Sequence, residues 1–388
     1  MKRLKVMTIF GTRPEAIKMA PLVKQLQETE EIESILCVTA QHREMLDMVL
    51  DLFQLKPNYD LNIMQHGQTI SDITVKVLKG LESILQEVKP DIVLVHGDTT
   101  TTFIGALAAF YQQIAVGHVE AGLRSGNIYS PYPEEMNRKL TGTLTSLHFA
   151  PTEGNYKNLI QEGIKEKNIF ITGNTVIDAL LQVVKKDYIF DNHLLNQIDY
   201  INKKVIVMTC HRRENWGEPM ENIFQAIVEV VKKHRNAEVV FPVHLNPKIR
   251  SLAEKVMGGV EAIHLIEPLD YEPFANLLNR AHLILTDSGG IQEEAPALGK
   301  PILVLRTETE RPEAVEAGTV KVVGVEKDII IKEVDKLLLN SEHYLQMANA
   351  VNPYGDGMAS KRIVTALKYY FGYIHTKPNN FKIESIEN

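Results

Sequence analysis

Short apolar runs rich in valine and isoleucine alternate with longer amphipathic stretches along the first half of this chain. Apolar strands separated by helices indicate a parallel β-sheet that is covered on both faces. The amphipathic stretches include Pro14–Glu28, which has proline in its first turn, and Ile70–Val88, which stops before Pro90. The strand-like runs are Lys5–Phe10, Ser34–Ala40, Ile92–His96, Ala115–Val119, Leu147–Ala150 and Ile169–Thr172.

The same alternation begins again in the second half, after a polar interruption. That interruption, DYIFDNHLLNQIDYINKK from Asp187, indicates a domain boundary between about residues 172 and 203. Because 388 residues exceed what one hydrophobic core usually organises, we predict two Rossmann-like α/β domains facing a central cleft, over residues 1–172 and 173–358. The second series of strand-like runs is Val205–Thr209, Val239–Pro242, Ile263–Ile266, Leu283–Thr286 and Pro301–Leu305.

The end of the chain has a turn-rich start, NPYGDG, followed by a helical pattern from Ala359 to Tyr370. We expect a C-terminal helix within residues 359–372 and a polar tail over residues 373–388. The pattern alone leaves open whether this helix covers its own domain or crosses back to the first one.

The composition bounds the class of protein. A net charge of −7 argues against nucleic acid or an anionic membrane as the main partner, because both need a basic face. No apolar stretch approaches the roughly 20 residues that span a bilayer, and the start MKRLKVMTIFG predicts a strand rather than a secretory signal. Cys37 and Cys210 are too sparse for a disulfide framework or a zinc site. A soluble, reduced, cytoplasmic protein is the simplest expectation.

Three acidic residues follow strand-like runs in the first half: Asp98 in LVHGDTTTT, Glu120 in VGHVEAGLR and Glu134 in SPYPEEMNRK. In an open α/β sheet the ligand lies beyond the carboxyl ends of the strands, so a bound substrate reaches side chains placed there. If the three carboxylates converge, they predict an enzyme that moves protons. Glu134 and Arg138, four apart on an expected helix, also suit a simple surface pair.

A metal site is a second interpretation of the same loops. His96 with Asp98, and His118 with Glu120, are spaced two apart, which on a strand directs each pair to one side. Neither an H-E-x-x-H helix nor a cysteine–histidine cluster accompanies them, so we expect no metal.

The segment LTDSGGIQEEAPALGKP predicts a phosphate-binding turn in the second half. It places Ser288, Gly289 and Gly290 between a strand and a helix, whose N-terminus offers backbone N–H groups and a positive dipole end. Glu294, about one helical turn further on, can accept hydrogen bonds from ribose hydroxyls. Alternatively, the serine caps the helix and the glycines pack it against the sheet.

Several basic residues are placed to reach an anion. Arg311, at the start of the next helix, can clamp a diphosphate with its guanidinium, and His211 follows the first strand of the second domain. Arg13 and Lys18, in FGTRPEAIK, begin the helix after the first strand. Each also has a plainer interpretation, as a solvated cation, a structural histidine or part of a capped helix.

Together these motifs resemble one family. The chain is similar to the bacterial non-hydrolysing UDP-N-acetylglucosamine 2-epimerases over nearly its whole length, through GTRPEAIKMAPL, TAQHREML, VHGDTTTT, GHVEAGLR, PYPEEMNR, TGNTVIDAL, HRREN, PVHLNP, TDSGGIQEEAP, ERPEA and NPYGDG. The resemblance implies the glycosyltransferase-B architecture, with the active site between two Rossmann-like domains and the C-terminal helix returning to the first.

The resemblance implies the interconversion of UDP-N-acetylglucosamine and UDP-N-acetylmannosamine by inversion at C2, which supplies cell-surface polysaccharide synthesis. The C2 proton has no adjacent carbonyl to acidify it, so inversion needs either oxidation by a nicotinamide or departure of the group at C1. The dinucleotide fingerprint G-x-G-x-x-G occurs nowhere in the sequence, which favours departure without a cofactor. The resemblance also implies departure of the group at C1. The route is anti elimination of UDP to a 2-acetamidoglucal, followed by re-addition of UDP with protonation on the opposite face of C2.

When residues are matched motif by motif, the resemblance implies roles for single residues. Asp98, Glu120 and Glu134 become the candidate acid and base groups, with Arg138 and His211 supporting charge. The UDP-sugar ligands are expected to be the uracil contacts Leu269 and Phe274, the ribose ligand Glu294, the first-domain ligands Arg13 and Lys18, and the diphosphate ligands Ser288, Gly289, Gly290 and Arg311.

In several relatives a second UDP-N-acetylglucosamine binds beside the first as an activator. An arginine and a glutamine that some members use there fall at Gly67 and Glu44 in this chain. The matching residues that are present are Gln41, His42, Arg212 and His244. The resemblance also implies a homodimer.

Other activities on the same fold stay open. A glycosyltransferase would release UDP permanently, and a hydrolysing 2-epimerase would free N-acetylmannosamine. A metal-dependent hydrolase would lose activity in chelator, and a pure nucleotide-sugar-binding module would bind UDP without exchanging the C2 proton. The three acids of the first half favour proton transfer and therefore the epimerase.

Overall fold

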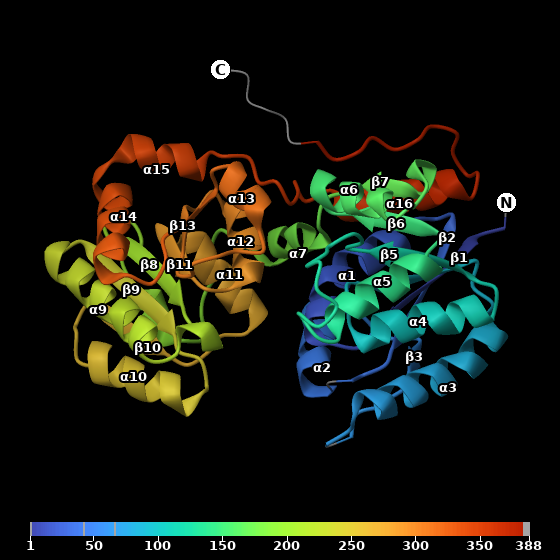
Figure 1. The fold of residues 1–388 in the computed structure, drawn as a ribbon, viewed down its shortest axis with the longest axis horizontal. Helices are drawn as coiled ribbons and strands as arrows, with labels where there is room; N and C mark the ends of the chain where they lie inside the picture. The colour runs from blue at the N-terminus through green and yellow to red at the C-terminus, as the bar shows by residue number, and fades with distance from the viewer. Residues whose placement is uncertain (1, 42, 66, 383–388) are drawn as a thin grey trace. The chain divides into compact units, whose positions relative to one another are not determined.

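The computed structural model describes residues 2–41, 43–65 and 67–382, and the chain divides into two compact units (Figure 1). The first unit holds Met1–Gln182 and Tyr354–Lys382, and the second holds Val183–Pro353. Each unit is an α/β structure built on one sheet of parallel strands, as expected. Among the described helices, none is both long and apolar enough to cross a bilayer.

The first unit contains a seven-stranded sheet in the order β3-β2-β1-β4-β5-β6-β7. Its strands are β1 (Leu4–Phe10), β2 (Ile32–Val38), β3 (Tyr59–Asp60), β4 (Ile92–His96), β5 (Ala115–Val119), β6 (Leu147–Ala150) and β7 (Ile169–Ile171). Its helices are α1 (Arg13–Gln27), α2 (Arg43–Leu52), α3 (Ile70–Val88), α4 (Thr100–Tyr111), α5 (Glu134–Leu144), α6 (Glu153–Gln161), α7 (Thr175–Val183) and α16 (Ala359–Tyr370). The central strands β4 and β6 are buried along their whole length, which explains why their sequences, IVLVH and LHFA, are apolar apart from one histidine in each.

The first unit extends past residue 172, where we expected the boundary, because α7 packs on it. Asp178 of α7 is buried and accepts hydrogen bonds from the backbone N–H groups of Ala359 (3.2 Å) and Ser360 (2.8 Å). These are the first residues of α16, so Asp178 supplies the N-terminal cap that the sequence before α16 lacks. Helix α16 also packs against α1, so the C-terminal helix lies on the first unit.

The segment expected as a free polar tail is attached to the sheet as far as residue 382. The Asn380 side chain accepts a hydrogen bond from the N–H of Ile171 (3.1 Å), and the N–H of Phe381 donates to the Ile171 carbonyl (2.7 Å). Phe381 is only 8% exposed. Because β7 is an edge strand, this segment satisfies backbone groups that would otherwise be open for pairing.

The second unit contains a six-stranded sheet in the order β10-β9-β8-β11-β12-β13. Its strands are β8 (Lys204–Thr209), β9 (Ala237–Pro242), β10 (Ile263–Ile266), β11 (Leu283–Thr286), β12 (Ile302–Val304) and β13 (Val320–Val322). Its helices are α8 (His193–Gln197), α9 (Glu218–Lys233), α10 (Pro247–Met257), α11 (Tyr271–Arg280), α12 (Gly289–Glu294), α13 (Pro312–Glu316), α14 (Lys327–Leu339) and α15 (Ser341–Ala348).

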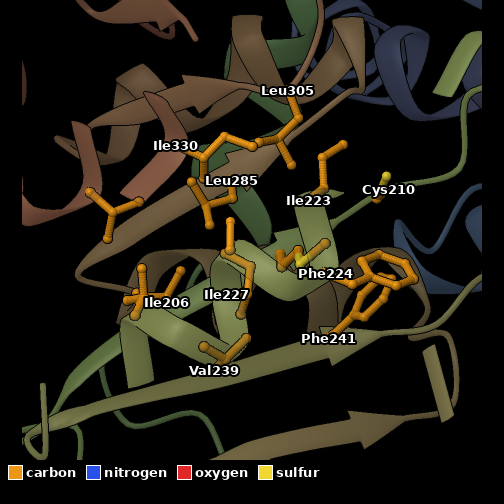
Figure 2. Close-up of a cluster of buried hydrophobic side chains, with 14 of the residues drawn as sticks. Ile206, Cys210, Ile223, Phe224, Ile227, Val239, Phe241, Leu285, Leu305 and Ile330 are labelled. Carbon is orange, nitrogen blue, oxygen red and sulfur yellow. The ribbon is translucent and has the colours of Figure 1, made fainter. Parts of the chain in front are cut away.

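Helix α9 fills the core on one face of the second sheet (Figure 2). Its side chains Ile223, Phe224 and Ile227 lie among residues of β8, β9 and β11. Phe224 meets Phe241 of β9 edge to face, with ring centroids 5.6 Å apart. Burial of such large apolar side chains contributes about 1.5–3 kcal/mol each, so this layer is a main source of the unit's stability.

In both sheets the strand order reverses beside the first strand of the unit. The reversal lies between β1 and β4 in the first sheet and between β8 and β11 in the second. Ligands of open α/β sheets bind beyond the carboxyl ends of the strands at this switch point. The functional residues are therefore expected in the turns that follow these four strands.

Candidate active site

Glu15 joins the two turns at the switch point of the first sheet. Its side chain is 2% exposed and accepts hydrogen bonds from the backbone N–H groups of Gly11 (3.1 Å) and Thr12 (2.9 Å) after β1. It also accepts from the hydroxyls of Thr99 (2.8 Å) and Thr102 (3.1 Å) after β4. The negative charge at the N-terminus of α1 is favourable, and the two turns are held together by one side chain.

The turn that carries Asp98 is fixed through two successive carbonyl groups. His118 Nε2 donates to the carbonyl of Gly97 (2.7 Å), and the amide of Asn137 donates to the carbonyl of Asp98 (2.9 Å). A carbonyl only accepts, so Nε2 of His118 carries the proton. Burial lowers the pKa of His118 to about 3, so the ring is neutral and acts as a structural donor.

The Asp98 carboxylate is paired with Arg138 of α5. Both Nε (3.0 Å) and Nη2 (2.7 Å) of Arg138 donate to Oδ2 of Asp98, and Nη1 donates to Glu135 (2.9 Å). Glu135 is fully buried and also accepts from the backbone N–H groups of Ser125 (3.0 Å) and Gly126 (3.2 Å). Arg138 is therefore held between two acids, and its partner within α5 is Glu135 rather than Glu134.

Glu134 is the first residue of α5. Its Oε2 atom is shielded from solvent and has no hydrogen-bond partner among the described residues. Asp98 and Glu120, the other two predicted acids, are both paired within the described residues. A negative charge in the first turn of a helix is favourable.

Glu120 follows β5 in a left-handed backbone conformation, with φ of 63°. Such a conformation is uncommon outside glycine and is characteristic of functional sites. The carboxylate forms an ion pair with Lys18 of α1, and His96 of β4 lies 3.3 Å away. Burial by itself would raise the pKa of Glu120, but the Lys18 ammonium and the neighbouring His96 ring hold it well below its usual value. Lys18 is thus a partner of a predicted acid, which the sequence did not indicate.

Arg13 is the first residue of α1, next to the turn that Glu15 holds. Its side chain is half-buried and has no hydrogen-bond or ion-pair partner among the described residues. A guanidinium without a carboxylate partner at this position is available to an anionic ligand.

Asp287 is the central acid of the second unit. It is fully buried and accepts hydrogen bonds from the backbone N–H groups of His211 and Arg212 (2.8 Å each) and from the Asn215 amide (3.2 Å). It thereby joins the ends of β8 and β11. The His211 ring lies 3.3 Å from Asp287 and stacks on His244 with centroids 5.6 Å apart. Burial lowers the pKa of His211, and the Asp287 carboxylate only partly opposes this.

Two arginines converge on the first turn of α12. A Cβ atom at Gly289 would lie 3.7 Å from Nη2 of Arg212 and 4.0 Å from Nη2 of Arg311. Arg311 is oriented by an ion pair between its Nε and Glu293, which is 5% exposed. Arg311 and Gly289 are thus brought together as expected. Arg212, which the resemblance placed at the activator site, lies at the same turn.

The remaining predicted ligands of the second unit lie around α11 and α12. A Cβ atom at Gly290 would be 3.6 Å from Oε1 of Glu294, so Glu294 faces the turn that begins at Ser288. Burial and the neighbouring Glu294 carboxylate raise the pKa of the Tyr271 hydroxyl well above its usual value. Leu269 and Phe274 lie before and within the start of α11, and both are half-buried.

The residues matched to the activator site are divided between the two units. Gln41 of the first unit accepts a hydrogen bond from Thr101 (3.3 Å), and His42 lies outside the described residues. His244 belongs to the second unit, beside His211. Within the part of the chain that the structure describes, no group of three histidine, cysteine or acidic side chains is arranged to hold a metal ion.

Most of this chain matches one protein family. A family model described as UDP-N-acetylglucosamine 2-epimerase matches residues 24–368. The chain belongs to the UDP-N-acetylglucosamine 2-epimerase family. It is accordingly an isomerase, as its motifs implied.

Relatives in this epimerase family match over nearly their whole length. The UDP-N-acetylglucosamine 2-epimerase of Bacillus subtilis is 56% identical over 381 residues, which cover 98% of this chain and 99% of that protein. The protein in the S. aureus MnaA-UDP co-structure is 52% identical to this chain in sequence. The two structures match with a TM-score of 0.87 over 98% of this chain and 100% of that one. The Neisseria meningitidis enzyme bound to UDP-GlcNAc is 54% identical, with a TM-score of 0.83 over 94% of this chain and 99% of that one. The fold is the glycosyltransferase-B type of these epimerases.

Three buried acids of this epimerase-family chain were not predicted as site residues. Glu15, Glu135 and Asp287 each bind backbone N–H groups of a turn that carries a predicted residue. Glu15 and Glu135 stand within the quoted motifs GTRPEAIK and PYPEEMNR, and Asp287 directly precedes Ser288. A capping-box pattern, threonine followed three residues later by glutamate, was the one signal available for Glu15.

Proposed function

We propose that this chain catalyses the reversible C2 epimerisation of UDP-N-acetylglucosamine to UDP-N-acetylmannosamine by eliminating UDP and adding it back. The observation that carries the proposal is the set of carboxylates at the carboxyl ends of β4 and β5 and the start of α5. These are Asp98, Glu120 and Glu134, and each has a different environment. Inversion needs proton transfer on two faces of C2, which one carboxylate alone does not serve.

The first half-reaction is an anti elimination. A carboxylate of the first unit takes the C2 proton, the electron pair of the C2–H bond forms the C1=C2 double bond, and the C1–O bond breaks. The bonding pair of C1–O leaves with UDP. In the return step UDP attacks C1 of the 2-acetamidoglucal while a second carboxyl group delivers a proton to the opposite face of C2. The first carboxylate ends protonated and the second ends ionised, so proton exchange with water restores both groups, and no cofactor is consumed.

Negative charge grows on the diphosphate as the C1–O bond breaks. Preorganised donors stabilise such charge best in a water-poor site. We assign this role to the α12 turn, with Ser288, Gly289 and Gly290, and to the guanidinium of Arg311. Arg212 joins them, because its guanidinium lies against Gly289. Arg13 and His211 are assigned supporting roles at the same diphosphate.

The uridine end is assigned to α11 and α12. Glu294 accepts from the ribose hydroxyls, Phe274 packs on the uracil ring, and Leu269 contacts uracil through its backbone. Support comes from the UDP-GlcNAc bound to the Neisseria meningitidis relative and the UDP in the S. aureus co-structure. The homodimer that the resemblance implies stays a prediction.

Solvent exchange tests this function. In deuterated water, incubation with UDP-N-acetylglucosamine should place deuterium at C2 of both sugars, because each crossing passes through a glycal that is reprotonated from exchangeable groups. Epimerisation without deuterium would contradict the proposal and indicate hydride transfer. Permanent release of UDP with accumulation of free N-acetylmannosamine would indicate the hydrolysing reaction instead.

A further inference from the structure

The three polar partners of Glu120 all contact the same oxygen. Lys18 of α1, His96 of β4 and Asn174 before α7 approach Oε2, His96 at 3.3 Å and Asn174 at 3.2 Å. The other carboxylate oxygen, Oε1, has no hydrogen-bond partner among the described residues. The carboxylate is therefore held by one oxygen and open at the other.

The His96 ring is buried beside Glu120. Its side chain is 4% exposed, and the approach of Nε2 to Glu120 is the one polar contact of its ring within the described residues. Burying an imidazole without good partners costs free energy, so a buried ring aimed at one carboxylate requires a reason. Its backbone is fixed as well, because Thr102 donates to the His96 carbonyl.

Asn174 is held in place by hydrogen bonds of its backbone and its side chain. Its N–H donates to the carbonyl of Tyr354 (2.6 Å), and its side-chain oxygen accepts from the N–H of Val176 (3.0 Å). The side-chain oxygen is thus engaged, which leaves the amide nitrogen to face Glu120.

We propose that His96 is a positioning residue for Glu120: with Asn174, it holds Oε2 so that Oε1 faces the reacting C2 of the sugar. This inference rests on the proposed function and deepens it. A base that must reach one hydrogen on one face of a ring needs a fixed orientation, and small misplacements of reacting groups cost up to about 100-fold in rate. The charged and titratable groups that face Glu120 are Lys18 of α1 and His96 itself.

The test compares His96→Gln, His96→Asn and His96→Leu. Glutamine places an amide donor where Nε2 lies, whereas asparagine is too short to reach Oε2 and leucine has no donor. We expect kcat to fall about 10- to 100-fold in His96→Leu and His96→Asn, with KM for UDP-N-acetylglucosamine within about 2-fold, and His96→Gln to stay within about 3-fold of the parent. If the leucine variant does not fold, the glutamine and asparagine pair decides.

His148 provides the matched control. It is a fully buried histidine on β6 whose ring has no hydrogen-bond partner among the described residues, and burial lowers its pKa to about 4. His148→Leu should retain the parent kcat when the rate is divided by the concentration of folded protein. Thermal unfolding of the variant is recorded alongside.

Two results would overturn the inference: an unchanged kcat in His96→Asn, or equal losses in the asparagine and glutamine variants. Deuterium incorporation by the parent distinguishes failure of the proposed function from failure of the inference about His96. If the parent incorporates no deuterium, the proposed function is contradicted. If it does so and the His96 variants keep the parental kcat, only the role of His96 is contradicted.

Discussion

Replacing Glu120 with glutamine is expected to lower kcat about 1,000-fold and to leave the affinity for UDP unchanged. The amide is nearly isosteric and still accepts a hydrogen bond from Lys18, so the site keeps its shape while the group loses its capacity to take a proton. Positioned acid–base groups contribute about 100- to 10,000-fold to rates, which sets the expected size. UDP affinity is expected to be retained because the residues that we assign to uridine and to the α12 turn belong to the second unit.

The measurement is steady-state epimerisation, followed by calorimetric titration with UDP. Glu30→Gln is the control, since Glu30 is an exposed acid of the first unit and no described interaction involves its side chain. A Glu120→Gln variant with parental kcat would remove Glu120 from the proton-transfer steps.

Replacing Arg311 with alanine should weaken UDP binding about 10- to 100-fold. Hydrogen bonds to charged groups contribute roughly 1.5–3 kcal/mol, and each 1.4 kcal/mol is a tenfold change in affinity. Arg311→Lys should give an intermediate loss, because lysine keeps the charge but not the two-pronged donor geometry. The kcat should fall as well, since the charge on departing UDP grows in the transition state.

Calorimetric titration with UDP measures this effect, and Arg235→Ala is the control because Arg235 is exposed on the same unit. Removing Arg311 also strips a buried carboxylate, Glu293, of its ion pair, so the unfolding temperature must be recorded alongside. Unchanged UDP affinity in a folded Arg311→Ala protein would contradict the diphosphate assignment.

The strands were predictable where burial on both faces keeps the sequence largely apolar. β4, β5 and β6 have the bounds that their apolar runs gave. β3 was missed because it has two residues, Tyr59 and Asp60, at the edge of the sheet, and β13 because Lys321 interrupts the apolar pattern of its three residues. Such short strands are defined by pairing with a neighbour rather than by their own sequence.

The site was predictable to the extent that topology dictates it. Strand-end positions made Asp98 and Glu120 candidates without any contact information, because ligands lie at the carboxyl ends of parallel strands, and the structure places them after β4 and β5. Partners were not predictable, because they come from distant parts of the chain. Lys18, expected as a phosphate ligand, pairs with Glu120, and Asp287 holds the turn at His211 through backbone groups.

The central claim is that the bond between C1 and the bridging oxygen breaks and re-forms during each inversion. It is tested by labelling that bridging oxygen of UDP-N-acetylglucosamine with a heavy isotope and recovering the sugar nucleotide after partial conversion. The β-phosphate of UDP rotates once the C1–O bond is broken, so reversible elimination predicts label at the non-bridging β-phosphate oxygens of the recovered sugar nucleotide. Mass spectrometry of fragments and phosphorus NMR locate the label. Full epimerisation with all label retained at the bridge would contradict the account.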